Sequence, residues 1–152
     1  MSEYPYPSDW DLAWLASDRS NYLAAFITAG SGPIPISLLP QLNRYEASEN
    51  LEYLMLQLPI VSEACLLVTV PTPDSYIELA RRGLYVFDLN DVHRTTAYSY
   101  AYEAVAAPTF PIRATSLSGK LARTASEQNL AKVRFDENRL IDISSYLDCS
   151  SS

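Results

Sequence analysis

The chain has 152 residues, of which 48% are hydrophobic and 19% are charged, a composition typical of a folded globular protein. Its formal net charge is −7, and most of the excess lies in residues 1–63, where eight acidic residues face only two arginines. This acidity argues against direct binding to nucleic acid or to an anionic membrane, because both need Lys and Arg to neutralise phosphates. It is compatible with a basic protein partner.

The cysteines and the N-terminus bear on the cellular compartment. Cys65 lies in an apolar run and Cys149 in a Ser-rich tail, so we expect a buried free thiol at Cys65, no structural disulfide and a reducing compartment. The N-terminus lacks the basic-then-apolar pattern of a signal peptide. No apolar run approaches the roughly 18 residues of a membrane span. We therefore expect a cytoplasmic protein with a single domain over residues 1–152.

The first third of the chain predicts a leader followed by two paired strands. We expect residues 1–9 to form an extended leader, because Pro5 and Pro7 restrict the residues before them. From Trp10 onward, two apolar runs joined by a short polar link predict a β-hairpin. Both faces of each run are apolar, which is typical of central strands covered on both sides. We expect Pro33 and Pro35 to end the sheet segment, since proline cannot donate a ladder hydrogen bond.

A helix is predicted over residues 41–58 by the spacing of its apolar residues. Its buried stripe consists of Ala47, Leu51, Leu54, Met55 and Leu58. The opposite side carries acidic and large residues together, namely Tyr45, Glu46, Glu49, Glu52, Tyr53 and Leu56. Either a second layer covers Tyr45 and Leu56 and leaves the glutamates solvated, or this side is a partner-binding face with aromatic anchors among carboxylates.

The middle of the chain alternates strands and a helix. Residues 65–70 predict a strand, and residues 75–82 predict a short helix that ends at Gly83. Two further strands are predicted over residues 84–89 and 98–107. Three tyrosines of the last strand share one face, which is typical of cross-strand aromatic packing: Tyr98, Tyr100 and Tyr102.

The last third gives weaker patterns. Residues 112–128 predict mostly loop, with one turn or two of helix around Leu117 and Leu121. Alternation over residues 131–135, a turn, and a short strand over residues 140–143 predict a second hairpin. We expect the Ser-rich end, residues 148–152, to be frayed.

One histidine is the main candidate for chemistry. His93 follows Asp91, with Asp88 shortly before it, and a carboxylate can orient a histidine as a general base. A single histidine without a second one or a well-placed cysteine argues against a zinc site. The chain has no G-x-S-x-G elbow for a serine nucleophile, and Gly30-Ser31-Gly32 continues into prolines rather than into a phosphate loop. We expect no cofactor.

Three segments resemble a known group of proteins: Trp14-Leu15-Ala16-Ser17-Asp18-Arg19; the run from Phe26-Ile27-Thr28-Ala29 through Gly30-Ser31-Gly32-Pro33-Ile34-Pro35; and Arg82-Gly83-Leu84-Tyr85-Val86-Phe87-Asp88 with Asp91-Val92-His93-Arg94. They resemble small bacterial immunity proteins of toxin systems, including contact-dependent growth inhibition. The resemblance implies a protein that binds and blocks a cognate toxin. It implies no catalytic residue, because an immunity protein needs none.

These observations combine into one prediction. We expect an α+β domain with a mainly antiparallel sheet, opened by the N-terminal β-hairpin and packed against the helices over residues 41–58 and 74–82. The expected function is that of a non-enzymatic immunity protein that occludes a basic toxin domain. The expected binding face is Tyr45, Glu46, Glu49, Glu52 and Tyr53, with Asp88, Asp91 and His93 as a second patch. The alternatives are a small enzyme using His93 with Asp88 or Asp91, and a structural subunit of an assembly.

Overall fold

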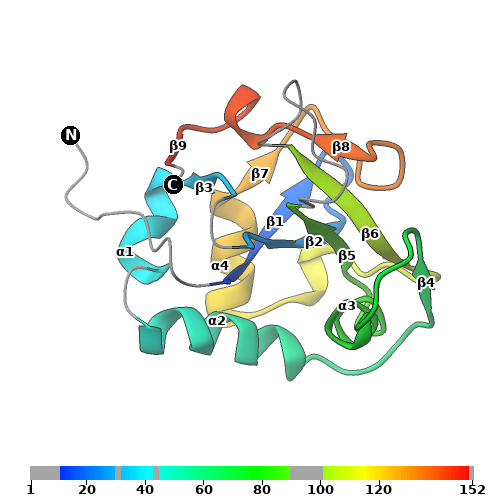
Figure 1. The fold of residues 1–152 in the computed structure, drawn as a ribbon. Helices are drawn as coiled ribbons and strands as arrows, with labels where there is room; N and C mark the ends of the chain where they lie inside the picture. Colours follow the sequence, from blue (N-terminus) through cyan, green and yellow to red (C-terminus); the bar gives the residue numbers. More distant parts are fainter. Residues whose placement is uncertain (1–10, 30–31, 43–44, 90–100, 151–152) are drawn as a thin grey trace.

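The computed structural model describes residues 11–29, 32–42, 45–89 and 101–150. These residues form an α+β arrangement in which a mixed sheet is covered by helices on one face and by the C-terminal part of the chain on the other (Figure 1). Seven strands of the described part belong to this sheet, in the order β4-β6-β5-β2-β1-β7, with β8 paired to β6. The strands are β1 (Ala13–Asp18), β2 (Leu23–Ile27), β4 (Ala64–Leu66), β5 (Tyr85–Asp88), β6 (Tyr102–Pro108), β7 (Asn129–Leu130) and β8 (Leu140–Ile141). A separate pair joins β3 (Ile34–Pro35) to β9 (Cys149–Ser150).

The sheet is mixed, so the expectation of a mainly antiparallel sheet is corrected. Strands β1 and β2 pair antiparallel, with Trp14 opposite Phe26. Strand β2 pairs parallel with β5, and β1 pairs parallel with β7. Parallel neighbours need long crossover connections, and helical segments lie in both connections of this chain. Every residue of β1 is buried, because both faces of the central strands are covered.

One face of the central strands carries a cluster of stacked aromatic rings. The ring of Phe26 lies 4.6 Å from that of Trp14 and 5.1 Å from that of Phe87, both in stacked geometry. Tyr102 and Phe135 meet Phe26 edge-on, at 5.1 and 5.9 Å. Such pairs stabilise the core by about 0.5–1.5 kcal/mol each beyond the apolar area they bury. This aromatic cluster joins β1, β2, β5 and β6 to the C-terminal segment, residues 131–150.

A glycine makes room for one of these rings. The hydroxyl of Tyr102 donates a hydrogen bond to the carbonyl oxygen of Pro33 at 2.8 Å. A Cβ atom on Gly32 would come within 2.5 Å of the same hydroxyl, closer than any side chain tolerates. Position 32 therefore requires glycine. Of the three tyrosines expected to share a face, Tyr102 is buried in the core, while Tyr98 and Tyr100 lie outside the described residues.

Helices cover the other face of the sheet (Figure 1): α2 (Tyr45–Leu56), α3 (Asp74–Ala80) and α4 (Gly119–Glu127), with a single-turn helix α1 (Leu39–Leu42) before them. Leu51 and Met55 of α2 are completely buried, in agreement with the predicted stripe. The hydroxyl of Ser17 on β1 donates to the carbonyl oxygen of Ala125 on α4 at 2.7 Å. No helix in the described part of the chain is both long and apolar enough to cross a membrane.

Helix α4 corrects the prediction of mostly loop over residues 112–128. It spans nine residues, and its buried residues are Leu121, Thr124 and Ala125. Their spacing of i, i+3, i+4 is helical, but only Leu121 is a large apolar residue. The sequence signal was therefore weak, and packing against β1 stabilises the helix.

The second hairpin was also predicted wrongly. Val133 and Phe135 are buried as expected, but the peptide N–H of Phe135 donates to the Asp18 carboxylate rather than to a neighbouring strand. Strand β8 pairs antiparallel with β6 instead. The tail is less frayed than expected, because Cys149 and Ser150 pair with β3. The expected leader, residues 1–9, lies outside the described residues.

Asp18 joins three parts of this fold. Its side chain is completely buried at the end of β1. One carboxylate oxygen accepts the peptide N–H groups of Ser20 and Tyr22, both at 2.9 Å. The other oxygen accepts that of Phe135 at 2.8 Å. The carboxylate therefore holds the β1–β2 connection and the C-terminal segment in place together.

We predict that Asp18→Asn destabilises the protein by about 2–3 kcal/mol, because an amide nitrogen cannot accept and leaves at least one buried peptide N–H unpaired. Urea denaturation followed by circular dichroism measures this loss. Asp136→Asn, which removes a carboxylate from an exposed ion pair with Arg134, is the matched control and should cost less than about 1 kcal/mol. Equal losses in the two variants would contradict the role assigned to Asp18.

Candidate functional site

The predicted binding face lies on α2, which forms the lower border of the molecule in Figure 1. Tyr45, Glu46 and Glu49 belong to the first turns of this helix, and their side chains lie outside the described part of the structure. Glu52 is half-buried. The Tyr53 side chain is 58% exposed, although Leu51 and Met55 beside it are completely buried. The helix is thus anchored on one side and presents a large aromatic residue to solvent on another.

The second predicted patch is described only at Asp88. This residue ends β5, and its carboxylate oxygen Oδ2 accepts a hydrogen bond from the Tyr76 hydroxyl of α3. The other oxygen, Oδ1, is buried and has no hydrogen-bond partner among the described residues. Asp91 and His93 lie outside the described residues. The structure therefore connects Asp88 with α3, not with the α2 face.

The surroundings of Asp88 change its protonation. Burial is the largest cause and raises the pKa of its carboxyl group, the hydrogen bond from Tyr76 lowers it, and the charge of Asp11 raises it; together they give a pKa of about 6. Burial, followed by the hydrogen bond and the charge of Asp88, raises the pKa of the Tyr76 hydroxyl. The carboxyl group of Asp88 therefore gains or loses its proton near pH 6 rather than near pH 4.

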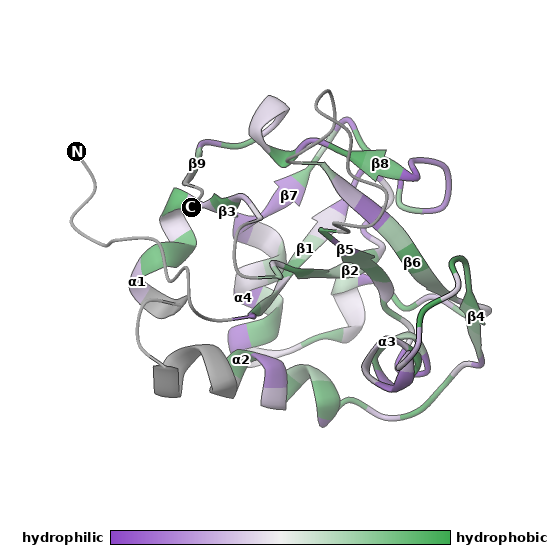
Figure 2. Ribbon diagram, in the orientation of Figure 1, coloured by the Kyte–Doolittle hydropathy of each residue, from purple (hydrophilic) through white to green (hydrophobic). Residues whose placement is uncertain are grey.

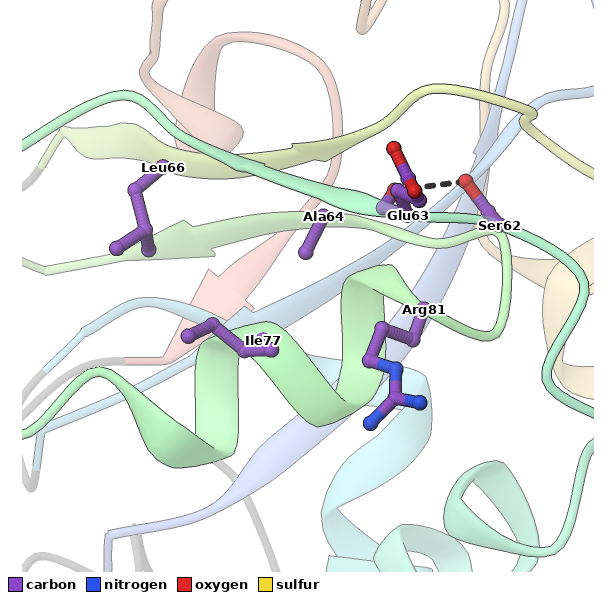
Figure 3. A pocket seen from close by; sticks show the side chains of 6 residues that line it. All are labelled: Ser62, Glu63, Ala64, Leu66, Ile77 and Arg81. Carbon is purple, nitrogen blue, oxygen red and sulfur yellow. Dashed lines mark hydrogen bonds between the residues drawn. The ribbon is translucent and has the colours of Figure 1, made fainter.

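Sequence reasoning missed a surface groove between β4 and α3, shown in Figure 3. Its volume is about 560 Å³. Ala64 and Leu66 project from β4 toward Ile77 on α3, while the other end of the groove is polar. The six lining residues are Ser62, Glu63, Ala64, Leu66, Ile77 and Arg81. The expected buried thiol of Cys65, which lies in the same strand, is in fact exposed.

The polar end of the groove is internally hydrogen-bonded. The Ser62 hydroxyl donates to the carbonyl oxygen of Glu63 at 2.8 Å. The Arg81 guanidinium lies 3.3 Å from a carboxylate oxygen of Glu78, and Arg82 lies 2.9 Å from the other oxygen of the same carboxylate. The charges around the groove are therefore largely compensated. The only sequence signal for this groove was the uncharged run of residues 64–70 between two proline-containing segments.

Comparisons with known proteins add no further site residue. No protein-family model matches the chain, and no curated protein or solved structure matches it. Within the described ranges, no group of three or more His, Cys, Asp and Glu side chains is arranged to hold a metal ion. The roles given above therefore depend on the contacts of the residues themselves, and the resemblance to immunity proteins stays a prediction.

We predict that Asp88→Asn becomes more stable relative to the natural chain as the pH rises. The pKa of Asp88 is about 6 in the folded protein and lower in the unfolded chain, so between these two values the folded state binds more protons than the unfolded state. The stability of the natural chain therefore falls as the pH rises from about 4 to about 6. Asparagine has no such proton. The difference should grow by about 1–2 kcal/mol over this range, after allowance for partial exposure to water.

Urea denaturation at several pH values measures this difference. Tyr76→Phe serves as the companion variant, since it removes the donor to the ionised carboxylate. It should lose the most stability above pH 6, where Asp88 carries its charge. A constant difference between Asp88→Asn and the natural chain at all pH values would show that Asp88 titrates like an exposed carboxylate.

Proposed function

We propose that this chain is a non-enzymatic, cytoplasmic bacterial immunity protein, which binds a basic toxin domain and occludes its active site. The observation that carries the proposal is the exposed Tyr53 on α2, in a helix whose sequence also contributes Glu46, Glu49 and Glu52. An exposed aromatic residue among carboxylates is a typical anchor for a basic protein surface. The resemblance of the Trp14–Arg19 and Phe26–Pro35 segments to immunity proteins supports the same function.

The anchoring of α2 suits it to this role. Leu51 and Met55 attach the helix to the core, so Tyr53 is presented from a helix with a fixed buried side. A tyrosine has few rotatable bonds and loses little conformational entropy when it is covered. The net charge of −7 attracts a basic partner over a distance and raises the association rate. In this mechanism the carboxylates meet the Lys and Arg side chains with which the toxin holds its own substrate.

A small enzyme is the second candidate. It is favoured by the carboxylate of Asp88, whose buried Oδ1 has no hydrogen-bond partner among the described residues and whose burial raises its pKa to about 6, in the range suited to proton transfer. In that case His93 would work with Asp88 or Asp91, and His93→Ala would abolish turnover while leaving the fold unchanged. An immunity protein that binds its toxin through α2 would keep its full binding activity after this substitution.

The central experiment is co-expression of the chain with the C-terminal domain of the large protein encoded directly upstream in its genome. The expected result is a stable 1:1 complex on co-purification, together with rescue of growth in cells that produce the toxin domain. No complex and no rescue, with both proteins folded, would overturn the proposal for that pair and favour the enzyme.

We predict that the triple variant Glu46→Lys, Glu49→Lys, Glu52→Lys associates with the toxin domain more slowly, by about tenfold or more at low salt. Its association rate should also depend less on ionic strength, since the attractive charges are gone. Stopped-flow or surface plasmon resonance measures both effects, after circular dichroism has shown that the variant is folded.

The matched control for this charge reversal changes the net charge equally at another place. Glu127→Lys, Asp136→Lys and Glu137→Lys replace three exposed acids on α4 and in the C-terminal segment. This control should retain a larger part of the association rate than the α2 variant. Equal slowing in the two variants would remove α2 from the interface and leave only a general effect of net charge.

We predict that Tyr53→Ala weakens the complex by about 1.5–3 kcal/mol, mainly through faster dissociation. Truncation of a central aromatic anchor removes its buried contact area. Tyr146→Ala is the control, because Tyr146 is also exposed, at 42%, but lies in the C-terminal segment. Unchanged dissociation of Tyr53→Ala would place the binding face elsewhere on the protein.

A further inference from the structure

Strand β4 is an open edge of the main sheet. It lies at the right-hand rim of the molecule in Figure 1, with β6 on its inner side. Two hydrogen bonds point toward β6: the peptide N–H of Thr109 donates to the carbonyl oxygen of Glu63 at 3.0 Å, and that of Leu67 donates to the carbonyl oxygen of Val105 at 2.9 Å. Hydrogen-bonding groups alternate in direction along a strand. The peptide groups of Ala64 and Leu66 therefore point outward, away from β6.

One end of this edge is already closed by the protein itself. The peptide N–H of Ser62, which also points outward, donates to the carbonyl oxygen of Arg81 at 3.0 Å. From Ala64 onward, no strand among the described residues pairs with the outer side of β4. The open edge thus consists of two residues with outward peptide groups, Ala64 and Leu66, on either side of Cys65.

The edge has none of the features that normally keep such a strand from pairing. Residues 64–70 contain no charge and no proline, whereas exposed edges are commonly protected by Lys, Pro or an inward charge. Figure 2 shows β4 as apolar as the central strands β2 and β5. Large apolar side chains are exposed on it and next to it, with exposed fractions of 41–70%: Ile60, Val61, Leu66 and Phe110.

We propose that β4 pairs antiparallel with β4 of a second copy of this chain, about a twofold axis at Cys65. In this register Ala64 of each copy lies opposite Leu66 of the other, so the outward peptide groups of both residues are satisfied in both copies. A register centred on Ala64 would instead need the peptide N–H of Ser62, which Arg81 already occupies. The edge is therefore complementary to itself, as a twofold interface requires.

The charge distribution favours a second copy over a basic partner at this edge. The strand is uncharged, and the groove beside it carries one charge of each sign, on Glu63 and Arg81, so a basic segment would gain no net electrostatic attraction here. A second copy brings an equally uncharged strand, and the net charge of −7 lies largely elsewhere in the chain. A standard interface buries about 800 Å² of each partner, which is a tenth of the 8038 Å² surface of this chain. The exposed apolar side chains around β4 extend the contact area beyond the paired backbones.

This register makes a specific geometric prediction at Cys65. Because Ala64 and Leu66 form the hydrogen-bonded pairs, the two Cys65 residues form a non-hydrogen-bonded pair, with Cα atoms about 4.5 Å apart. That distance lies within the range of a disulfide. The exposed Cys65 thiols can therefore report the register when they are oxidised deliberately.

Sedimentation equilibrium of the chain alone tests the proposal, independently of any toxin. We expect a dimer over a concentration series for the natural chain, and a shift to monomer for Leu66→Lys, which places two charges in the interface. Leu140→Lys is the matched control: its side chain is similarly exposed, at 49%, but it lies in β8 and should leave the dimer intact. A natural chain that is monomeric at all concentrations, or equal behaviour of the two variants, would overturn the proposal.

Cysteine crosslinking tests the register without altering the apolar edge. In a Cys149→Ser background, diamide should accept the two thiol hydrogens of a Cys65 pair and leave a disulfide-linked dimer. Moving the cysteine, with Cys65→Ser and Thr69→Cys, should abolish the crosslink, because position 69 lies opposite Val61 of the second copy. A crosslink at position 69 as strong as at Cys65, or none at Cys65 in a dimeric protein, would overturn the twofold axis at Cys65.

Discussion

The buried carboxylate of Asp18 is the interaction on which the arrangement of this protein depends. It accepts the peptide N–H groups of Ser20, Tyr22 and Phe135, so one side chain sets the connection between β1 and β2 and holds the C-terminal segment against the sheet. Phe135 in turn closes the aromatic cluster around Phe26. A buried charge is tolerated only when it is fully hydrogen-bonded, and here the backbone supplies those bonds.

The two surfaces to which we assign roles lie outside this rigid centre. Helix α2 uses Leu51 and Met55 to attach to the core and leaves Tyr53 in solvent. Strand β4 attaches to β6 on one side and leaves its other side open. A toxin on α2 and a second copy on β4 would use different borders of the molecule (Figure 1). Binding to a partner and self-association are therefore compatible in one protein.

Part of the fold and of the site followed from local patterns. Strand β5, helix α3 with its end near Gly83, and the buried stripe of α2 were predictable because hydrophobic periodicity and terminal signals are local properties. The pattern over residues 131–135 was misleading. Alternating buried residues resemble a strand even when their peptide N–H groups donate to side chains instead of to a neighbouring strand, as that of Phe135 does to Asp18. The exposure of Cys65 could not be foreseen either, because this edge strand has no charge and no proline and so has the composition of a central strand.

Local patterns were enough to predict the α+β class, the acidic character of the first half and the presence of an aromatic residue among glutamates on one helix. These properties depend on neighbours in the chain. Three further facts emerged only from the folded arrangement: β2 pairs parallel with β5, Asp88 meets Tyr76, and β4 is an edge of the sheet. Such facts depend on which distant segments come together, and long-range pairing is selected by the packing of the whole core rather than by any local pattern.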